Sequence, residues 1–490
     1  MMPILSALIL LPLLGAPIGY ALFRLNRRAG LAFCLSVTAA TLALSLAAYA
    51  LVALRPSPPG AYALVERYSW VSLPDFSFDL LLGLDGLGAV LLVLSSLLTL
   101  LAMAGSPALI REREGEYYSL MLLFEGAING VFSSLNLIFF YIFWDLVLIP
   151  MFLFIGIWGG PRRKYAALKF LLYTFTGSVV MLTGFLIAYF GSPVRSFNLP
   201  ELMGHVPATL QLYSLLAAFI GFGIKLPVFP FHSWLPDAHV EAPAPISVLL
   251  AGVLLKMGGY GFIRIGLQLF PEASRQLAWL FMAVGLATMF YGAIVALLSS
   301  DLKRMIALTS INHMGFVLLG AYAAIASGAA LGLQGAIFQM FNHGLAIGSL
   351  FLLSGYIHEQ AGTREISRLG GLRYAMPRTA ALLMLSSLAG MGFPLFSSFL
   401  SEFMVIAGAV AGYRAYSVAV LVPVITGAYF MWMLRRTVLS ERNEALPAHD
   451  LPTREALLLL AFLLPLTLLL FMPSLILSPL QPLVESVMGP

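Results

Sequence analysis

The sequence has little charge and almost no cysteine. Only 10% of its 490 residues are Asp, Glu, Lys or Arg, whereas soluble domains carry about a quarter. This is too little polar side chain to cover several soluble domains of that total length. A lone cysteine, Cys34, excludes a disulfide framework, a zinc cluster and an iron–sulfur cluster built from this chain alone. An apolar content of 60% excludes a disordered chain.

Long apolar runs take the place of the missing charge. A run of about 20 apolar residues can cross a bilayer as one helix. The longest polar connections, 55–79, 191–210 and 440–455, are expected to be ordinary loops, and no basic region marks the first run as a cleaved signal peptide. The sequence therefore predicts an all-α polytopic membrane protein with about 14 spans, at 2–23, 30–54, 80–104, 117–133, 137–157, 166–190, 210–231, 243–269, 276–298, 305–325, 331–357, 377–410, 415–434 and 456–473.

The basic residues predict an orientation. With 14 alternating spans, 19 of the 27 Lys and Arg residues fall on one side and 6 on the other, and 2 lie inside spans. Cytoplasmic loops are the ones enriched in Lys and Arg, so both termini are expected to face outward. The net charge of +5 then reflects topology, because a nucleic-acid site needs a clustered basic face. The six residues on the outer side are Arg55, Arg67, Arg195, Arg264, Arg275 and Arg414.

Five ionisable side chains fall inside the predicted spans: Glu125, Asp145, Lys225, Lys256 and Glu402. A charge at the centre of a membrane helix costs roughly 2.5–3.5 kcal/mol on insertion scales. One interpretation is that buried ion pairs merely fix the helix packing. Five such residues on different spans favour the other interpretation, a relay of titratable groups that carries protons.

Glu125 and Asp145 flank a short turn around residues 133–136, each about ten residues from its centre. At an α-helical rise both lie roughly 15 Å from that turn, and so at matching depth. If they face each other, they titrate as a coupled pair. The alternative is that Glu125 turns toward another helix and stays neutral.

Helix breaks adjoin two of the five residues. In GFGIKLPVFPFHSWLPDAH, Pro227 and Pro230 each remove a backbone hydrogen bond just after Lys225. In GMGFPLFSSFLSEF, Pro394 and two glycines interrupt the span before Glu402, and nearby hydroxyls are expected to bond the freed carbonyls. Transporters place ion sites on paired discontinuous helices, so these two segments predict ion translocation. The interrupting glycines are Gly390 and Gly392, and the hydroxyls belong to Ser397, Ser398 and Ser401.

Lys256 lies in mid-span beside a flexible glycine pair, Gly258–Gly259, and two histidines inside spans, His313 and His343, are expected to connect it to the other groups. Histidine, with an unperturbed pKa of about 6.5, passes protons at neutral pH. The alternative for each is a neutral core residue. No spacing resembles a metal site or a nucleotide-binding loop. The remaining histidines near span ends, His232, His239 and His358, are expected at the interface.

Several motifs carry a family resemblance: FWDLVLIPMF, GIWGG with KYAALKFLLYT, IKLPVFPFHSWLPDAHVEAPAPISVLLAGVLLKMGGYGFIR, DLKRMIALTSINHMGFVLLG and SEFMVIAG. From LGLDGLG near Asp85 to the last span, the chain resembles the antiporter-like membrane subunits of complex I and of multi-subunit sodium/proton antiporters. The glutamate at position 402 makes the chain similar to one branch of this family, because sister subunits carry lysine at the corresponding position.

The resemblance implies fourteen helices with two inverted five-helix repeats, each containing a discontinuous helix. The implied segments are 1–110 with three helices, the repeats 111–270 and 271–438, and a C-terminal helix in 439–490. It implies a proton-translocating subunit of an NADH:quinone oxidoreductase that binds no cofactor itself. FMN, iron–sulfur clusters and quinone are expected in partner subunits. The expected partners are other membrane-arm subunits, sister antiporter-like subunits among them, and membrane lipid, with no nucleic acid.

The resemblance also assigns roles. Asp145 stands where the family has a glutamate paired with the broken-helix lysine, Lys225. Lys256 matches the central lysine, His313 and His343 match relay histidines, and Glu402 matches the second half-channel.

Three departures from the family pattern matter: Asp145 is one methylene shorter than the usual glutamate, Asn136 replaces a common aspartate, and PLFSSF replaces a proline–glycine break. Asp145 should therefore reach Lys225 less directly, and we infer that Glu125 compensates. The rival functions are a secondary sodium/proton antiporter subunit, which Glu402 disfavours, and a scaffold whose charges only hold helices together.

Overall fold

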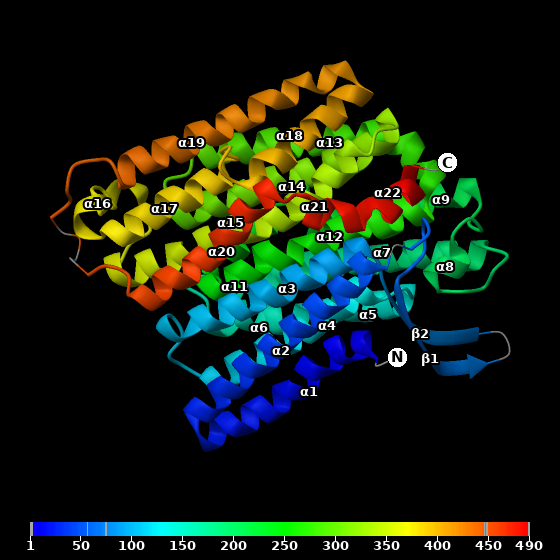
Figure 1. Cartoon of the computed structure of the whole chain (residues 1–490), viewed down its shortest axis with the longest axis horizontal. Coiled ribbons are helices and arrows are strands. Elements are labelled where there is room, and N and C mark those ends of the chain that lie inside the picture. The colour runs from blue at the N-terminus through cyan, green and yellow to red at the C-terminus, as the bar shows by residue number, and fades with distance from the viewer. Residues whose placement is uncertain (1–2, 56, 74–75, 445, 447–448, 489–490) are drawn as a thin grey trace.

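The computed structural model describes residues 3–55, 57–73, 76–444, 446 and 449–488. Long helices lie side by side in one bundle, with both termini at the same end of it (Figure 1). Twelve helices of the described residues are long and apolar enough to cross a membrane. They are α1 (Ile4–Leu25), α2 (Arg27–Leu54), α3 with a 3-10 turn (Gly86–Ala108), α5–α6 (Leu137–Trp158), α7 (Arg163–Gly191), α9 (Ala208–Lys225), α11 to η3 (Ala244–Leu267), α13 (Pro271–Leu297), α14 (Leu302–Ser327), α15 (Leu331–Ala361), η5–α19 (Arg414–Thr437) and α20 (Thr453–Phe471).

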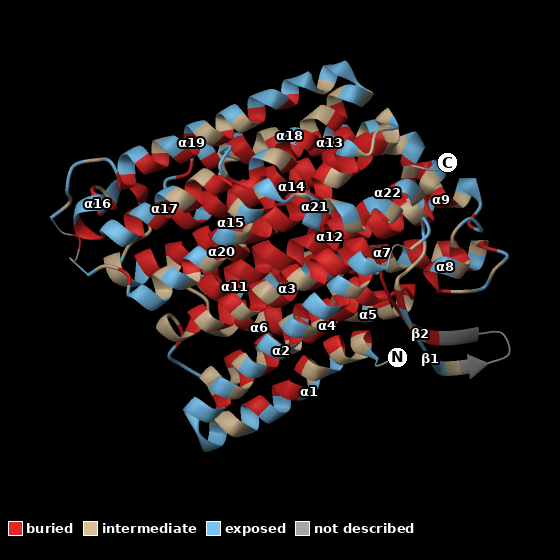
Figure 2. Ribbon diagram, viewed as in Figure 1, coloured by how far each residue is buried: buried red, intermediate tan, exposed pale blue. Residues whose placement is uncertain are grey.

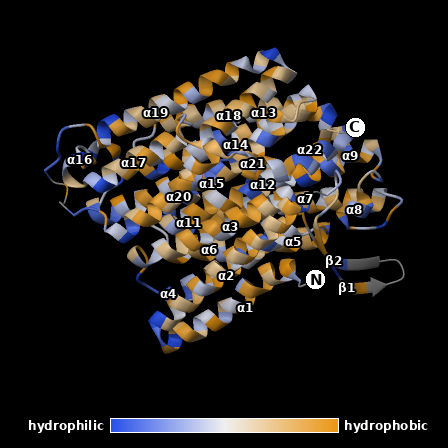
Figure 3. Ribbon diagram, viewed as in Figure 1, coloured by the Kyte–Doolittle hydropathy of each residue, from blue (hydrophilic) through white to orange (hydrophobic). Residues whose placement is uncertain are grey.

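Each of the 14 predicted ranges overlaps a helix. The two ranges beyond those twelve are α4 (Glu114–Ser133) and a helix interrupted between α17 (Pro377–Gly390) and α18 (Ser397–Gly412). The predicted polytopic helical membrane protein is thus confirmed. Hydrophilic residues gather toward the ends of the bundle, and hydrophobic ones cover the helices between (Figure 3). The shorter helices are α8 (Leu199–Leu202), α10 (Trp234–Glu241), α16 (Leu372–Ala375), α21 (Ser474–Leu477) and α22 (Gln481–Met488).

The prediction of an ordinary loop over 55–79 is wrong. Strand β1 (Leu64–Leu73) pairs antiparallel with β2 (Phe76–Leu84), in a register that sets Leu64 opposite Leu84. The apolar run 80–84 belongs to this hairpin, so the third span begins at Gly86 instead of residue 80. Asp85 marks the boundary, because its carboxylate accepts a hydrogen bond from the Gly88 backbone N–H at 3.1 Å and caps α3.

Three helices form the buried centre of the bundle: Ala244–Leu267, α14 and α15. Figure 2 shows them in red, while the outer α1 and α19 carry exposed faces. Small residues let α13 and α14 approach closely. A Cβ atom on Gly292 of α13 would lie 2.4 Å from the backbone nitrogen of Asn312 on α14. This tight contact fixes the position of the next residue, His313.

Candidate functional site

The first predicted helix break is confirmed. Helix α9 ends at Lys225, residues 226–233 turn, and α10 begins at Trp234. Val228 N–H donates to the Gly223 carbonyl at 2.9 Å, and Trp234 Nε1 donates to the Ile224 carbonyl at 2.9 Å. The Gly223 carbonyl, which Pro227 would leave unpaired, is thereby satisfied, and so is that of Ile224. The break holds the Lys225 side chain fully buried at the end of a helix.

Asp145 and Lys225 are close without forming a hydrogen bond. Asp145 lies next to a second interruption, between α5 (Leu137–Leu146) and α6 (Leu148–Trp158). Its Oδ2 accepts from Ser178 Oγ at 3.1 Å, whereas its Oδ1 and Lys225 Nζ have no hydrogen-bond partner. The Lys225 ammonium lies 5.4 Å from the centre of the Trp144 ring. The two groups remain near enough for an electrostatic interaction between them. The shorter aspartate therefore leaves the pair open, as its length predicts.

Lys256 is in direct contact with a histidine. Its helix alternates π-helical and α-helical stretches, with Leu250–Leu254 and Phe262–Leu267 π-helical around α12 (Leu255–Gly261). The Lys256 Nζ donates to the Ala251 carbonyl at 2.8 Å and lies 2.5 Å from Nδ1 of His343. Such π-stretches are frequent at functional sites. The rings of His343 and His313 follow edge to face, with centroids 5.4 Å apart.

The predicted break before Glu402 is confirmed as well. Residues 391–396 separate α17 from α18, and the buried Glu402 places Oε1 3.6 Å from Nε2 of His313. Ser398 Oγ donates to the freed Ala389 carbonyl at 2.6 Å, as predicted. The other two serines were wrongly assigned to freed carbonyls of this break. Ser397 and Ser401 instead donate to side-chain oxygens on α15, those of Asn342 at 2.7 Å and Gln339 at 2.5 Å.

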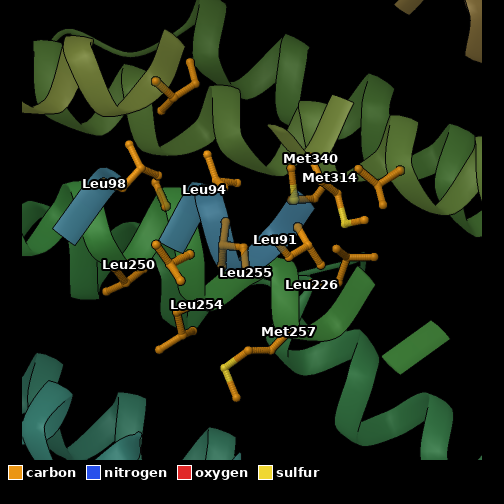
Figure 4. Close-up of a cluster of buried hydrophobic side chains, with 14 of the residues drawn as sticks. Leu91, Leu94, Leu98, Leu226, Leu250, Leu254, Leu255, Met257, Met314 and Met340 are labelled. Atoms are coloured by element: carbon orange, nitrogen blue, oxygen red, sulfur yellow. The ribbon is translucent and has the colours of Figure 1, made fainter. Parts of the chain in front are cut away.

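Four of the predicted residues thus lie next to one another in a series: Lys256, His343, His313 and Glu402. Only the Lys256–His343 step is a hydrogen bond, since His343 Nε2 and both ring nitrogens of His313 have no hydrogen-bond partner among the described residues. Among the described residues, no hydrogen bond or ion pair joins this series to Lys225. The sequence neighbours Leu226, Leu255 and Met257 belong instead to a buried cluster with Met314 and Met340 (Figure 4). The site therefore has two polar parts, Asp145–Lys225 and Lys256–Glu402, with apolar side chains beside both.

Gly258 belongs to this packing. A Cβ atom there would lie 2.6 Å from the backbone nitrogen of Leu226. We expected the Gly258–Gly259 pair to supply flexibility, but at Gly258 the small residue allows the end of α9 to approach the helix of Lys256.

Glu125 is not brought to the series. It is fully buried in α4, which packs against α1, α2, α3 and α5, and neither carboxylate oxygen has a hydrogen-bond partner among the described residues. Among the described residues no hydrogen bond or ion pair joins Glu125 to Asp145, so the structure lends no support to a facing pair. His239, expected at the interface, is instead fully buried and stacked on Phe351, with ring centroids 4.4 Å apart. His232 is also buried, while His358 is exposed.

Sequence reasoning missed several polar residues of the site. Ser178 is the hydrogen-bond donor to Asp145. Gln339 and Asn342 bind the serines that hold the Glu402 helix. The spacing of Gln339, Asn342 and His343 is a signal that could have found them, since residues three and four apart share one helix face.

The absence of a side chain at Gly392 leaves room for the Glu402 carboxylate. We expect Gly392→Ala to abolish most of the function of Glu402. The glycine has φ +69°, and an added Cβ would lie 2.7 Å from Glu402 Oε2. The backbone alone costs about 1–2 kcal/mol in this region. Thermal unfolding and proton transport of the variant should therefore both fall.

Gly328→Ala is the matched control, because Gly328 has φ +67° with nothing within 4 Å of its Cβ position. It should lose similar stability and keep its transport. Equal transport in the two variants would show that the contact with Glu402 is unimportant.

Comparisons with known proteins bear on the fold and the family of this chain. The model of the family described as NADH:quinone oxidoreductase/Mrp antiporter, TM, matches residues 134–427. The chain is 40% identical over 442 residues to NADH-quinone oxidoreductase subunit M of Rickettsia prowazekii (strain Madrid E), covering 89% of this chain and 88% of that one. It is similar to a chain of respiratory complex I from Thermus thermophilus with bound NADH, with a TM-score of 0.87, 29% identity and 99% of each chain covered.

A chain of the Mrp complex from Dietzia sp. DQ12-45-1b is similar in fold. It has a TM-score of 0.83 and 22% identity, with 100% of this chain and 98% of that one covered.

Proposed function

This chain belongs to the NADH:quinone oxidoreductase/Mrp antiporter transmembrane family, and from that premise we propose how it moves protons across the membrane. It is a multi-pass membrane subunit of the NADH-quinone oxidoreductase subunit M type. The proposed proton path uses, in order, Asp145, Lys225, Lys256, His343, His313 and Glu402.

One observation carries this proposal. Lys256, His343, His313 and Glu402 touch in series, and each is at most 4% exposed. Buried ionisable groups are costly in a membrane and mark ion or proton pathways. A packing role requires no such series across four different helices. The series also contains two histidines, the side chain best suited to passing protons near neutral pH.

The open Asp145–Lys225 pair acts as the switch in this proposal. While the carboxylate is near, its charge stabilises the Lys225 ammonium. A movement that takes it away leaves the ammonium alone in a low-dielectric site, where charge is strongly disfavoured. The proton then moves toward Lys256, through water that must cross the apolar cluster at Leu226 and Met257. His343 and His313 pass it to Glu402, and Glu402 releases it.

The rest of the assembly supplies the energy. Because the chain's proposed role needs no redox centre, FMN, iron–sulfur clusters and quinone belong to partner subunits in this proposal. Quinone reduction there would move Asp145 through the neighbouring membrane-arm subunits. We place the chain in the cytoplasmic membrane of a bacterium with both termini outside, because the Lys- and Arg-rich side is cytoplasmic. We also propose that residues 111–270 and 271–438 form the two inverted repeats. The first contains the Asp145–Lys225 switch, and the second contains Glu402, which releases the proton.

The alternative function is a sodium/proton antiporter subunit, because the fold is also similar to that of a chain of the Mrp complex. The two are separated by purifying the complex that contains this chain and reconstituting it in proteoliposomes. We expect quinone-dependent oxidation of the electron donor to acidify or alkalinise the vesicle lumen equally with and without sodium. Proton movement that requires a sodium gradient, and that proceeds without quinone reduction, would identify the antiporter instead.

A further inference from the structure

Another buried charged side chain, Arg264, lies inside a span, and the proton path does not use it. Arg264, counted above among the residues of the outer side, is 1% exposed in the π-helical stretch Phe262–Leu267. The charge count placed it wrongly because it lies near the end of its span. Its Nη2 is 2.5 Å from Oδ1 of Asp85, at the start of α3. The guanidinium lies 5.3 Å from the ring centres of both Tyr62 and Tyr260.

A cavity reaches this pair from one end of the bundle. It has a volume of about 650 Å³, and Asp85, Arg55 and Glu485 are among its lining residues. The β-hairpin, α22 and both termini lie at this end (Figure 1). Arg264 does not line the cavity, so Asp85 stands between the cavity and the guanidinium.

The pair is connected in sequence to the centre of the proton path. Lys256, Tyr260, Arg264 and Gln268 follow at intervals of four on one helix, a spacing that sets them along one face. From Lys256 to Arg264 the distance along the helix is about 12 Å at an α-helical rise. Arg264 Nε donates to the Tyr260 hydroxyl at 3.3 Å, and Nη1 donates to Gln268 Oε1 at 2.9 Å. A proton that moved from Lys256 toward the cavity along this face of the helix would cover this distance before it reached Arg264.

We propose that the Asp85–Arg264 pair seals the central lysine, Lys256, from the cavity at the terminus end of the bundle. A guanidinium does not lose its proton in proteins, so it cannot hand a proton onward as lysine or histidine does. Its fixed positive charge also opposes the passage of a further positive charge beyond Asp85, as arginines in selective pores do. Asp85 and the two tyrosine rings hold this cation in place. Without the seal, protons on Lys256 would equilibrate with the cavity instead of moving on to His343.

This inference rests on the proposed proton path, but its test does not require turnover. The complex is reconstituted in proteoliposomes, an internal pH dye is loaded, and the decay of an imposed pH gradient is followed with no electron donor present. With Arg264→Gln we expect the gradient to collapse about tenfold faster. Arg264→Lys keeps the cation and should leak less than Arg264→Gln. The matched control is Arg275→Gln. Arg275 is an exposed arginine near the start of α13, the helix that follows the one with Arg264.

A second variant guards against misfolding. Arg264→Gln leaves Asp85 without its partner, so Asp85→Asn combined with Arg264→Gln neutralises both members and should fold more stably. The double variant is expected to leak as fast as the single one. Vesicles of either variant that hold the gradient as long as the unsubstituted complex would overturn the seal. So would an equal leak from Arg275→Gln. If instead pumping survives Lys225→Ala, the proposed path fails, and the leak measurement still decides the seal.

Discussion

Proton pumping is expected to be lost in Lys225→Ala, while the complex assembles normally. The substitution removes the buried cation at the end of α9, and with it the group that the Asp145 carboxylate controls in the proposed path. A loss of one titrating group should lower proton transport at least about tenfold, in line with the removal of a general acid–base group. Transport is read from the pH change in proteoliposomes during quinone reduction, and assembly from the yield of intact complex. Lys164→Ala, an exposed lysine in α7, is the control.

A second variant at this position separates the relay from a scaffold. Lys225→Arg retains the positive charge, but a guanidinium does not release its proton. If the charge only holds helices together, arginine restores the function that alanine removes. The relay predicts that arginine restores assembly at most, with pumping as low as in Lys225→Ala. Full pumping by either variant would remove Lys225 from the path.

Glu402→Gln is expected to have an effect of similar size. Glutamine keeps the length and hydrogen-bonding capacity of the side chain, so the break at Gly392 and the serine contacts to α15 should persist. What is lost is the ability to bind and release a proton next to His313. Proton transport should therefore fall at least about tenfold without a comparable fall in thermal stability.

Glu125→Gln is the matched control for this substitution. Glu125 is also a fully buried membrane carboxyl, but no described contact connects it to the series from Lys256 to Glu402. Its pumping should stay within about twofold of the unsubstituted chain. A large loss at Glu125 with little effect at Glu402 would reverse the assignment. A large loss at both would support the compensation of the short Asp145 by Glu125.

The spans and breaks were open to prediction because their causes are local. Apolar length predicts a membrane helix wherever it occurs, and Pro227, Pro230 and Pro394 interrupt hydrogen bonding whatever surrounds them. The hairpin at 64–84 was missed for a related reason. Its second strand is as apolar as the helix that follows, so only the Asp85 cap distinguishes the two.

Contacts between helices were harder to predict. The sequence names Glu125 and Asp145 at matching depth, but depth does not say which way a side chain points. In the structure Asp145 accepts a hydrogen bond from Ser178 on α7, whereas the Glu125 carboxylate has no hydrogen-bond partner among the described residues, although its helix packs against that of Asp145. Arg264 is a second residue whose contacts the sequence did not predict. Its place near a span end led us to count its charge on the outer side, and only the structure, where it pairs with Asp85, 179 residues away, shows that it is buried.

By itself, the sequence determined that this is a polytopic helical membrane protein with two broken helices, each beside an ionisable residue. Those properties follow from hydropathy and backbone chemistry within one helix. The tertiary structure decided which buried groups touch: it joined Lys256 to Glu402 through His343 and His313, left Lys225 apart, and paired Arg264 with Asp85. The physical reason is that charge in a low-dielectric interior is governed by neighbours within a few ångströms, and those neighbours come from distant helices whose packing no local pattern specifies.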